Sequence, residues 1–295
     1  MILAIVGPTA SGKSAVGLEL AEELGGEIVS CDSMQLYRGF DIGTAKPTLA
    51  EQARVRHHLI DVAEPSERFS AAQYSALADA ALADIAARGR RAILVGGTGL
   101  YLRALRWGLF DAPPGDEALR ERLYADERAA PGSLHARLST VDPPSAQRIG
   151  PNDLVRLVRA LEVAELTGTP LSEHHAAHDR TERHPMRVVV LDPPKDILDA
   201  RITERTAQLL AHGLVDETRA LVARHGRAAG PFQSVGYHEA LAFLDGTLRE
   251  AELAPAIVRA TRYYARRQRT WFRKEREVTT VGDPQSLRAA FAGLR

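Results

Sequence analysis

The sequence has 295 residues, of which 45% are hydrophobic and 26% charged, an ordinary composition for a large soluble chain. No apolar run approaches the roughly 20 residues that a membrane-spanning helix needs. The start of the chain lacks the basic residues and the length of a signal peptide. One cysteine, Cys31, excludes an intrachain disulfide, and the 38 basic and 38 acidic residues cancel. These features predict a cytoplasmic protein with no membrane partner.

Short apolar runs alternate with helical patterns in the first part of the chain. Residues 2–6, 27–31, 58–62 and 92–95 have the length and composition of strands. Residues 14–24 and 70–87, and a segment from Leu100, have helical patterns. Alternation of this kind predicts a parallel α/β sheet flanked by helices.

The texture changes after residues 111–115, DAPPG. Residues 116–178 read as helical throughout, including a helix at 153–166 capped by Asn152. The strand-like RVVVL at 187–191 then needs neighbours in a sheet. We therefore predict an α/β core at 1–111 and 179–295, interrupted by a helical insertion domain at 112–178. Helices dominate 197–276, and 278–281 is a candidate final strand.

A phosphate-binding loop follows the first predicted strand. The residues GPTASGKS match G-x-x-x-x-G-K-[ST] between a strand and a helix, which predicts a P-loop NTPase-like sheet. Backbone N–H groups and the helix start attract phosphate oxygens. Lys13 is expected to reach the terminal phosphates, and the Ser14 hydroxyl to bind Mg²⁺. The predicted phosphate ligands are Gly7, Pro8, Thr9, Ala10, Ser11, Gly12, Lys13 and Ser14.

Asp32 follows the second predicted strand and is expected at the same sheet edge as the loop, where ligands bind in such folds. Its carboxylate would be a base or a magnesium ligand, and a turn residue is the alternative. The strand at 92–95 leads into GGTGLY, residues 96–101, rather than into the acid of a Walker B strand. A vigorous nucleotide hydrolase is therefore less attractive.

Arginines recur at helical spacing near the end of the chain. On one helix face they would form a track that binds the phosphate backbone of a nucleic acid. The alternative is a solvated face whose arginines pair with acidic residues elsewhere in the chain. Ile257, Ala260, Tyr264 and Trp271 recur on another face and are expected to anchor the helix to the core. The arginines, spaced 3, 4, 3, 4, 3, are Arg259, Arg262, Arg266, Arg269, Arg273 and Arg276.

Histidines and the cysteine have plainer interpretations. His174, His175 and His178 could place two ligands at i and i+4, but no cysteine or obvious acid completes a zinc site. We expect an exposed helix end there. Cys31 at a strand end is expected to be buried packing rather than a nucleophile.

These segments together resemble the bacterial tRNA dimethylallyltransferases, also called isopentenyltransferases. The matching segments, in family order over nearly the whole chain, are GPTASGKS (7–14), DSMQLYRGFDIGTAKP (32–47), GGTGLY (96–101), QSVGYHE (233–239) and ARRQRTWFR (265–273). The resemblance implies transfer of a dimethylallyl group from its diphosphate to the exocyclic N6 amine of the adenosine 3′ of the anticodon. It implies Mg²⁺ as cofactor, the tRNA anticodon stem-loop as partner, and a monomer.

The resemblance also implies roles for individual residues. Asp32 would be the general base, Lys13, Ser14 and Arg205 would assist at the diphosphate, and Thr98 would lie in the channel that admits the adenine. Val155 replaces a glutamine that the family commonly has and cannot make its polar contact. The implied tRNA contacts are Asp32, Ser33, Met34, Gln35, Thr98, Arg120, Arg156, Arg159, Gln233, Ser234, Val235, Gly236, Tyr237 and His238, to which the arginine pattern adds Arg262, Arg266 and Arg269.

Other functions stay open at this point. A small-molecule kinase would bind ATP on the loop and use Asp32 to deprotonate an acceptor hydroxyl. A relative that prenylates free adenine nucleotides would have little use for the arginine pattern. A non-catalytic RNA-binding protein would use the loop only to sense nucleotide.

Overall fold

The structure, a computed structural model, describes residues 1–178 and 181–292. It has two compact units. The core unit joins Met1–Trp107 to Glu182–Arg295, and the helical unit is Gly108–Thr181. The predicted insertion, 112–178, lies within the helical unit. No helix among the described residues combines the length and apolar character that crossing a membrane requires.

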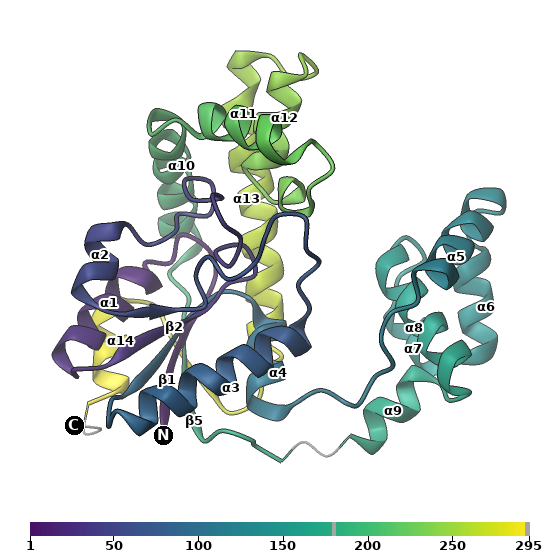
Figure 1. The fold of residues 1–295 in the computed structure, drawn as a ribbon, viewed down its shortest axis with the longest axis horizontal. Helices are drawn as coiled ribbons and strands as arrows, with labels where there is room; N and C mark the ends of the chain where they lie inside the picture. Colours follow the sequence, from purple (N-terminus) through teal and green to yellow (C-terminus); the bar gives the residue numbers. More distant parts are fainter. Residues whose placement is uncertain (179–180, 293–295) are drawn as a thin grey trace. The chain divides into compact units, whose positions relative to one another are not determined.

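The core unit is built on a parallel sheet of six strands within the described residues, in the order β3-β2-β4-β1-β5-β6 (Figure 1). Ile2 of β1 lies opposite Met186 of β5, so the chain returns to the middle of the sheet after the helical unit, as the RVVVL pattern predicted. The strands are β1 Ile2–Val6, β2 Glu27–Cys31, β3 His57–His58, β4 Ala92–Gly96, β5 Met186–Leu191 and β6 Val278–Val281.

One predicted strand is wrong in extent. Residues 58–62 were expected to be extended, but β3 has only two residues, His57 and His58. Leu59 and Asp61 have positive φ values of 62° and 54°, which turn the chain out of the strand. A short strand suits this position, because β3 is an edge of the sheet.

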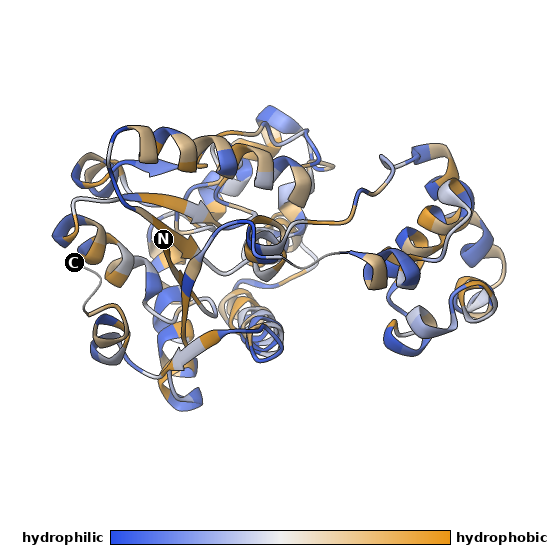
Figure 2. Ribbon diagram, turned by 90° about the horizontal axis from the view of Figure 1, so that it is seen from below, coloured by the Kyte–Doolittle hydropathy of each residue, from blue (hydrophilic) through white to orange (hydrophobic). Residues whose placement is uncertain are grey.

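Alternation along the strands places helices on both faces of the sheet. Leu3 and Ile5 of β1 belong to a cluster that α1 and α14 cover, whereas Ala4 and Val6 belong to the larger cluster beneath α3 and α4. The period of two in side-chain direction explains this division. Figure 2 shows the strands as the most continuous hydrophobic segments of the core unit.

Helices α10 to α13 extend the core unit beyond the carboxyl ends of the strands (Figure 1). The core unit's helices are α1 Lys13–Glu23, α2 Leu49–Arg54, α3 Ala71–Ala87, α4 Gly99–Trp107, α10 Lys195–Ala211, α11 Leu214–His225, η1 (3₁₀) Gly230–Gln233, α12 Tyr237–Leu244, α13 Glu250–Phe272 and α14 Pro284–Ala290.

The helical unit packs around its own small core, which includes Leu123, Leu138 and Leu157. Its α8 begins one residue later than predicted: Asp153, rather than Asn152, is the N-cap, and its carboxylate accepts from the Arg156 N–H. The unit's helices are α5 Glu117–Ala129, α6 Ser133–Val141, α7 Pro143–Arg148, α8 Leu154–Thr167 and α9 Leu171–Ala177.

Candidate active site

The loop between β1 and α1 has the backbone of a phosphate cradle. A side chain at Gly7 would overlap the carbonyl oxygen of Leu191 in β5, and Gly12 has φ 93°. Glycine is therefore required at both ends of the loop. No acceptor within residues 1–178 and 181–292 is found for the backbone N–H groups of Gly12, Lys13 and Ser14. N–H groups of this kind at the start of a helix have the arrangement that attracts an anion.

A cavity of ≈ 340 Å³ opens beside this loop. That volume falls in the range of small-molecule sites. Its walls come from the phosphate loop, the turn after β2, the following loop, α10, the segment before α12, and α13. Among its polar lining residues are Thr9, Lys13, Ser14, Asp32, Ser33, Gln35, Thr44, Arg205, Gln233, Ser234, Thr261, Tyr264, Arg267 and Gln268.

Charged groups meet at the end of the cavity that residues 7–14 form, which we call the phosphate end. Lys13 Nζ donates to the Pro8 carbonyl at 3.1 Å. Burial lowers the pKa of Lys13 to about 8, with Asp32 acting against this shift and Arg205 acting with it. Burial also lowers the pKa of Arg205, while the charge of Asp32 raises it. Two cations and one carboxylate therefore share a poorly hydrated space, which strengthens their interaction with an anionic ligand.

Gln268 of α13 fixes the phosphate loop against the loop after β4. Its side chain is buried, accepts from the Thr9 N–H at 2.8 Å and donates to the Gly97 carbonyl at 2.9 Å. A side chain at Gly97 would overlap Gln268, and one at Gly99 would overlap the ring of Trp271. The glycines of GGTGLY are thus explained by close packing against α13.

The turn after β2 presents Asp32 to the cavity. One carboxylate oxygen of Asp32 accepts from the Met34 N–H at 2.9 Å, which leaves the second oxygen for other partners. The Thr98 hydroxyl accepts from the Ser33 N–H at 3.0 Å and so holds the same turn. Asp32, Ser33, Met34 and Gln35 all line the cavity.

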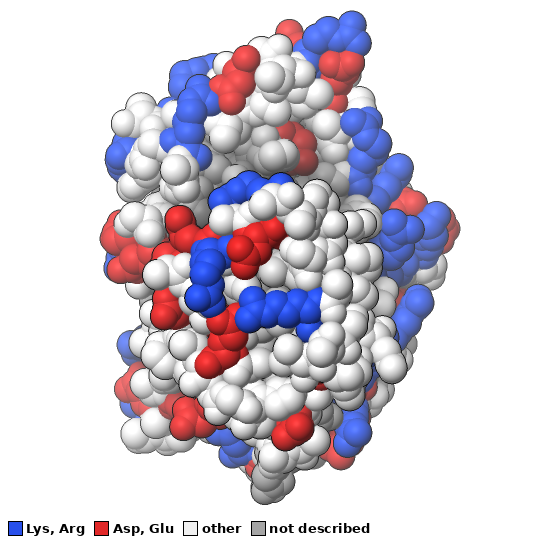
Figure 3. Space-filling view, turned by 90° about the vertical axis from the view of Figure 1, so that its right-hand side faces the viewer, with Lys and Arg blue, Asp and Glu red and all other residues white. Residues whose placement is uncertain are grey.

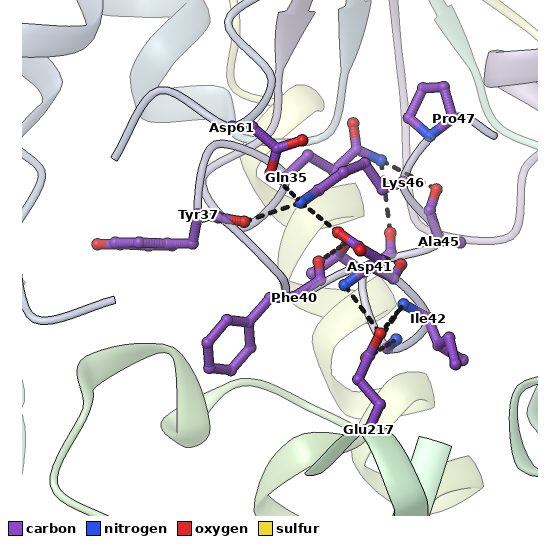
Figure 4. Close-up of polar contacts among 12 residues, drawn as sticks. Gln35, Tyr37, Phe40, Asp41, Ile42, Ala45, Lys46, Pro47, Asp61 and Glu217 are labelled. Carbon is purple, nitrogen blue, oxygen red and sulfur yellow. Dashed lines mark hydrogen bonds and ion pairs between the residues drawn. The ribbon is translucent and has the colours of Figure 1, made fainter. Parts of the chain in front are cut away.

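A loop after this turn forms the far end of the cavity, with Gly43, Thr44, Ala45 and Pro47 in its lining. Lys46 anchors the loop (Figure 4): its buried ammonium lies 2.8 Å from the Tyr37 carbonyl and 2.6 Å from carboxylate oxygens of both Asp41 and Asp61. We call this part of the cavity the base end, to distinguish it from the phosphate end formed by residues 7–14.

The sequence model of a family described as IPP transferase matches residues 35–275. The chain belongs to the IPP transferase family. It is 54% identical over 285 residues to a tRNA dimethylallyltransferase of Anaeromyxobacter sp. (strain Fw109-5), covering 96% of this chain and 95% of the relative. It is 46% identical to a tRNA dimethylallyltransferase of Myxococcus xanthus (strain DK1622), covering 99% of this chain and 96% of that relative.

Solved structures of the family agree with this assignment. A full-length tRNA isopentenylpyrophosphate transferase from Bacillus halodurans superposes with TM-score 0.70 at 39% identity, covering 98% of this chain and 93% of the other. A eukaryotic dimethylallyltransferase acting on tRNA gives TM-score 0.77 at 28% identity, covering 92% of this chain and 69% of the other. The predicted fold class and family are confirmed.

Most residues predicted at the active site of this family member lie together. Lys13, Ser14, Asp32 and Arg205 line one cavity, together with 33–35 and 233–236. Thr98 is not one of the described residues that line this cavity. Its hydroxyl accepts a hydrogen bond from the Ser33 N–H. Its predicted place in an adenine channel stays a prediction. Lys13, Ser14 and Arg205 also line a second opening of ≈ 270 Å³ on the α10 side of the loop.

Tyr237 does not lie where a tRNA contact would. It is fully buried, and its hydroxyl bonds Glu217 and the Gly43 N–H. The neighbouring His238 is exposed. Both residues were predicted to contact tRNA because they are adjacent in the sequence. In the first turn of α12, however, their side chains point to different sides of the helix.

The basic track on α13 is shorter than predicted. The helix ends at Phe272, so Arg273 and Arg276 do not continue its face. Arg269 is wrong as part of an exposed track, because its side chain is only 14% exposed and pairs with Asp192. An inward arginine at helical spacing looks the same in sequence as an outward one.

Arg259, Arg262 and Arg266 remain on the outside of α13. Arg262 lies 3.4 Å from a carboxylate oxygen of Asp199, and Arg266 stacks on the ring of Tyr263, which is 57% exposed. Elsewhere basic and acidic side chains are interspersed, as on the face in Figure 3.

Arginines of the helical unit are held by a buried acid. Glu162 has no exposed side-chain surface and binds both Arg120 and Arg159. Arg156 pairs with Asp153 at 3.2 Å but is 59% exposed, beside the exposed Val155. The roles predicted for these arginines in tRNA binding stay predictions.

Cys31 is fully buried, and burial raises the pKa of its thiol to about 12, so the packing interpretation is confirmed. The Nε2 of His174 lies 3.1 Å from the Thr167 hydroxyl and its ring stacks on Phe110, while the neighbouring His175 is exposed.

The sequence alone did not indicate that α13 lines the cavity. Tyr264 was expected only to anchor the helix, yet it lines the cavity with Ile257, Thr261 and Gln268. The spacing of 4, 3 and 4 between these positions is that of one helix face. Polar Thr, Tyr and Gln on a face that should be apolar were the available signal.

Proposed function

We propose that the protein transfers a dimethylallyl group from dimethylallyl diphosphate to the N6 amine of the adenosine 3′ of the anticodon in tRNA, releasing diphosphate. One observation carries the proposal: a phosphate cradle and the carboxylate of Asp32 line the same cavity, beside a space large enough for a purine. The names of the relatives favour allyl transfer over the kinase alternative.

The phosphate end would stabilise the leaving group. Breaking the bond between the allylic carbon and oxygen leaves negative charge on the diphosphate, and donors fixed in advance lower the energy of that charge. Here they are the N–H groups at the start of α1, the Lys13 ammonium and the Arg205 guanidinium. Because both side chains are only partly exposed, water screens their attraction for the growing charge less than it would at an open surface.

The donor set at the phosphate end fits Mg²⁺. Mg²⁺ prefers oxygen ligands, commonly one or two protein groups together with substrate phosphates. The hydroxyl of Ser14, which is exposed at the start of α1, would hold it, with Asp32 in the same cavity. When bound, the ion would neutralise charge on the diphosphate.

Where the two ends of the cavity meet, Asp32 would act as general base. Attack by the N6 nitrogen on the allylic carbon forms the new C–N bond and leaves a proton on that nitrogen, which a carboxylate can accept. The oxygen of Asp32 that does not bind Met34 is available for this proton. The adenine must leave its stack to reach the cavity, where 32–35 would hold it.

The surface proposed for the RNA backbone is smaller than the sequence suggested. Arg262 and Arg266 on α13 are exposed cations beside an exposed aromatic ring, a combination that suits phosphates and unpaired bases. Arg156 and the exposed end of α12 at His238 would add contacts.

We further propose that the protein acts as a monomer in the cytoplasm. Its single cysteine is buried and unpaired, which suits a reducing compartment. Sedimentation at micromolar concentration tests the oligomeric state: a species near 32.1 kDa supports a monomer, and one of twice that mass contradicts it.

The decisive experiment is incubation with unmodified tRNA, Mg²⁺ and dimethylallyl diphosphate, followed by nucleoside mass analysis. The expected product is an adenosine heavier by one dimethylallyl group. A parallel reaction with γ-labelled ATP tests the kinase alternative. Label transfer from ATP without allyl transfer would overturn the proposal, and tight tRNA binding without any transfer would favour a non-catalytic role.

A further inference from the structure

The loop at the base end has little regular structure of its own. Residues 41–47 lie between β2 and α2 without helix or strand, yet Gly43, Thr44, Ala45 and Pro47 line the cavity. The backbone N–H groups of residues 41–46 need partners, and the shape of the cavity depends on where those partners lie.

Glu217 of α11 supplies them. Its carboxylate accepts from the N–H groups of Asp41 at 3.2 Å, Ile42 at 2.9 Å and Gly43 at 3.4 Å. Figure 4 shows Glu217 reaching from the helix to the loop. Successive N–H groups that converge on one carboxylate form an anion nest, and hydrogen bonds to a charged acceptor are stronger than neutral ones.

Tyr237 closes the arrangement from α12. Its hydroxyl donates to Glu217 and accepts from the Gly43 N–H at 3.1 Å. Burial and the neighbouring charge of Glu217 raise the pKa of Tyr237, so the hydroxyl keeps its proton. A side chain at Gly43 would overlap the tyrosine ring, which explains the glycine. Phe40 packs edge-on against the same ring, with centroids 4.8 Å apart.

The position of this loop determines where the Gln35 side chain lies, because the two are joined by hydrogen bonds. The Gln35 amide nitrogen donates to the carbonyls of Thr44 at 3.4 Å and Ala45 at 3.2 Å, and its oxygen accepts from the Ser30 hydroxyl. The segment just before Tyr237, residues 233–236, lines the cavity as well. Both walls of the base end are therefore tied to the pair formed by Glu217 and Tyr237.

We propose that Glu217, with Tyr237, is a positioning residue that sets the shape of the base end and thereby selects the acceptor. The proposal rests on the proposed function, because the acceptor is taken to be an adenine of RNA. Glu217 is not in the cavity lining, so it acts through the loop rather than on the substrate. Lys46 holds the loop independently through Tyr37, Asp41 and Asp61, so loss of Glu217 removes the acceptor of the N–H groups of residues 41–43 without releasing the whole loop.

The test compares Glu217→Ala, Glu217→Gln and Tyr237→Phe with Asp216→Ala, a control on the same helix whose side chain is 80% exposed and pairs with Arg219. Glu217→Ala is expected to lower kcat/KM for tRNA by ~10-fold or more, with KM for dimethylallyl diphosphate within about twofold. Glu217→Gln should recover part of the loss, since an amide oxygen still accepts. Equal damage to both substrates, or no damage, overturns the proposal.

Hydrogen–deuterium exchange gives a readout independent of activity. Peptides covering 40–47 should exchange faster in Glu217→Ala and Tyr237→Phe than in wild type or Asp216→Ala. Unchanged exchange overturns the positioning role even if transfer is impaired. If the wild type fails to prenylate tRNA, the proposed function fails, whereas the exchange result still decides whether Glu217 holds the loop.

Discussion

The two ends of the cavity are built in opposite ways. The backbone donors of the phosphate end come from one continuous stretch, residues 7–14, whose glycines and helix start shape it, although Gln268 binds Thr9 from 259 residues away. The base end joins segments far apart in the chain: Ile42 and Glu217, which hydrogen bond there, are 175 residues apart. The backbone of the end that binds a common chemical group is thus encoded mostly by local sequence, with Gln268 and Arg205 added by the fold, whereas the end that must recognise a particular acceptor depends on the tertiary fold throughout.

The largest expected effect concerns Asp32, where the two ends meet. Asp32→Ala should slow the chemical step by ~10²–10⁴-fold while tRNA affinity is kept, because a general base is lost. Single-turnover kinetics with saturating tRNA measures this. Asp32→Asn separates the roles, since an asparagine oxygen can still accept from the Met34 N–H. If the asparagine variant were nearly as active as wild type, Asp32 would only stabilise the turn and would not be the general base.

The next effect is confined to the phosphate end. Gln268→Met removes the partners of the Thr9 N–H and the Gly97 carbonyl, each of which costs ~1–3 kcal/mol when left unsatisfied in the interior. We expect KM for dimethylallyl diphosphate to rise roughly tenfold and the Tm to fall. Gln285→Met on α14, at an exposed position, is the control. If KM for tRNA rose equally, the two ends would not be separable.

A smaller effect tests whether the RNA that enters the base end also contacts the exposed arginines of α13. Arg262→Ala with Arg266→Ala should weaken tRNA binding and reduce the slope of log Kd against log salt by about one unit for each phosphate contact. Arg269→Ala should leave the slope unchanged and lower the Tm, because Asp192 loses its partner. Binding titrations at several salt concentrations measure both. If the slope decreased in Arg269→Ala, Arg269 would belong to the RNA-binding face, as the sequence predicted.

The smallest effect is a pH dependence at the phosphate end. Folding lowers the pKa of Lys13 to about 8, so its charge is present below that pH and is lost as the pH rises through it. Affinity for pyrophosphate should therefore fall by roughly threefold between pH 7 and 9, because a bound anion raises the pKa of Lys13 and binding at the higher pH must then take up a proton. Calorimetry of Lys13→Met supplies the background from the ligand's own titration. Parallel curves for both proteins would contradict this role.

The same contrast explains what the sequence could predict. The strands, the phosphate loop and the place of Asp32 follow from local patterns: apolar runs, glycine spacing and the rule that ligands bind at the carboxyl ends of parallel strands. Apart from the extent of β3, the strands and the strand–loop–helix context of the phosphate loop were predicted correctly, including the return of residues 187–191 to the sheet, and Asp32 lies in the same cavity as that loop.

The remainder depends on partners that no local pattern names. Glu217 reads as an ordinary acid in the first turn of a helix, and its three backbone partners lie in a distant loop. Arg269 shares the spacing of exposed arginines but meets Asp192. The shortness of β3 follows from the positive φ at Leu59, a residue that rarely adopts it.

The strand order also has a consequence for synthesis on the ribosome. β1 pairs on one side with β4, which ends at Gly96, and on the other with β5, which begins at Met186. The ribosome adds about 5–20 residues per second, so on the order of 5 to 20 s pass between completion of β4 and the start of β5, the second neighbour of β1. During that interval a nascent sheet presents an open apolar edge, a template for unwanted pairing. The residues translated meanwhile include the helical unit, whose separate core can fold before the sheet is complete.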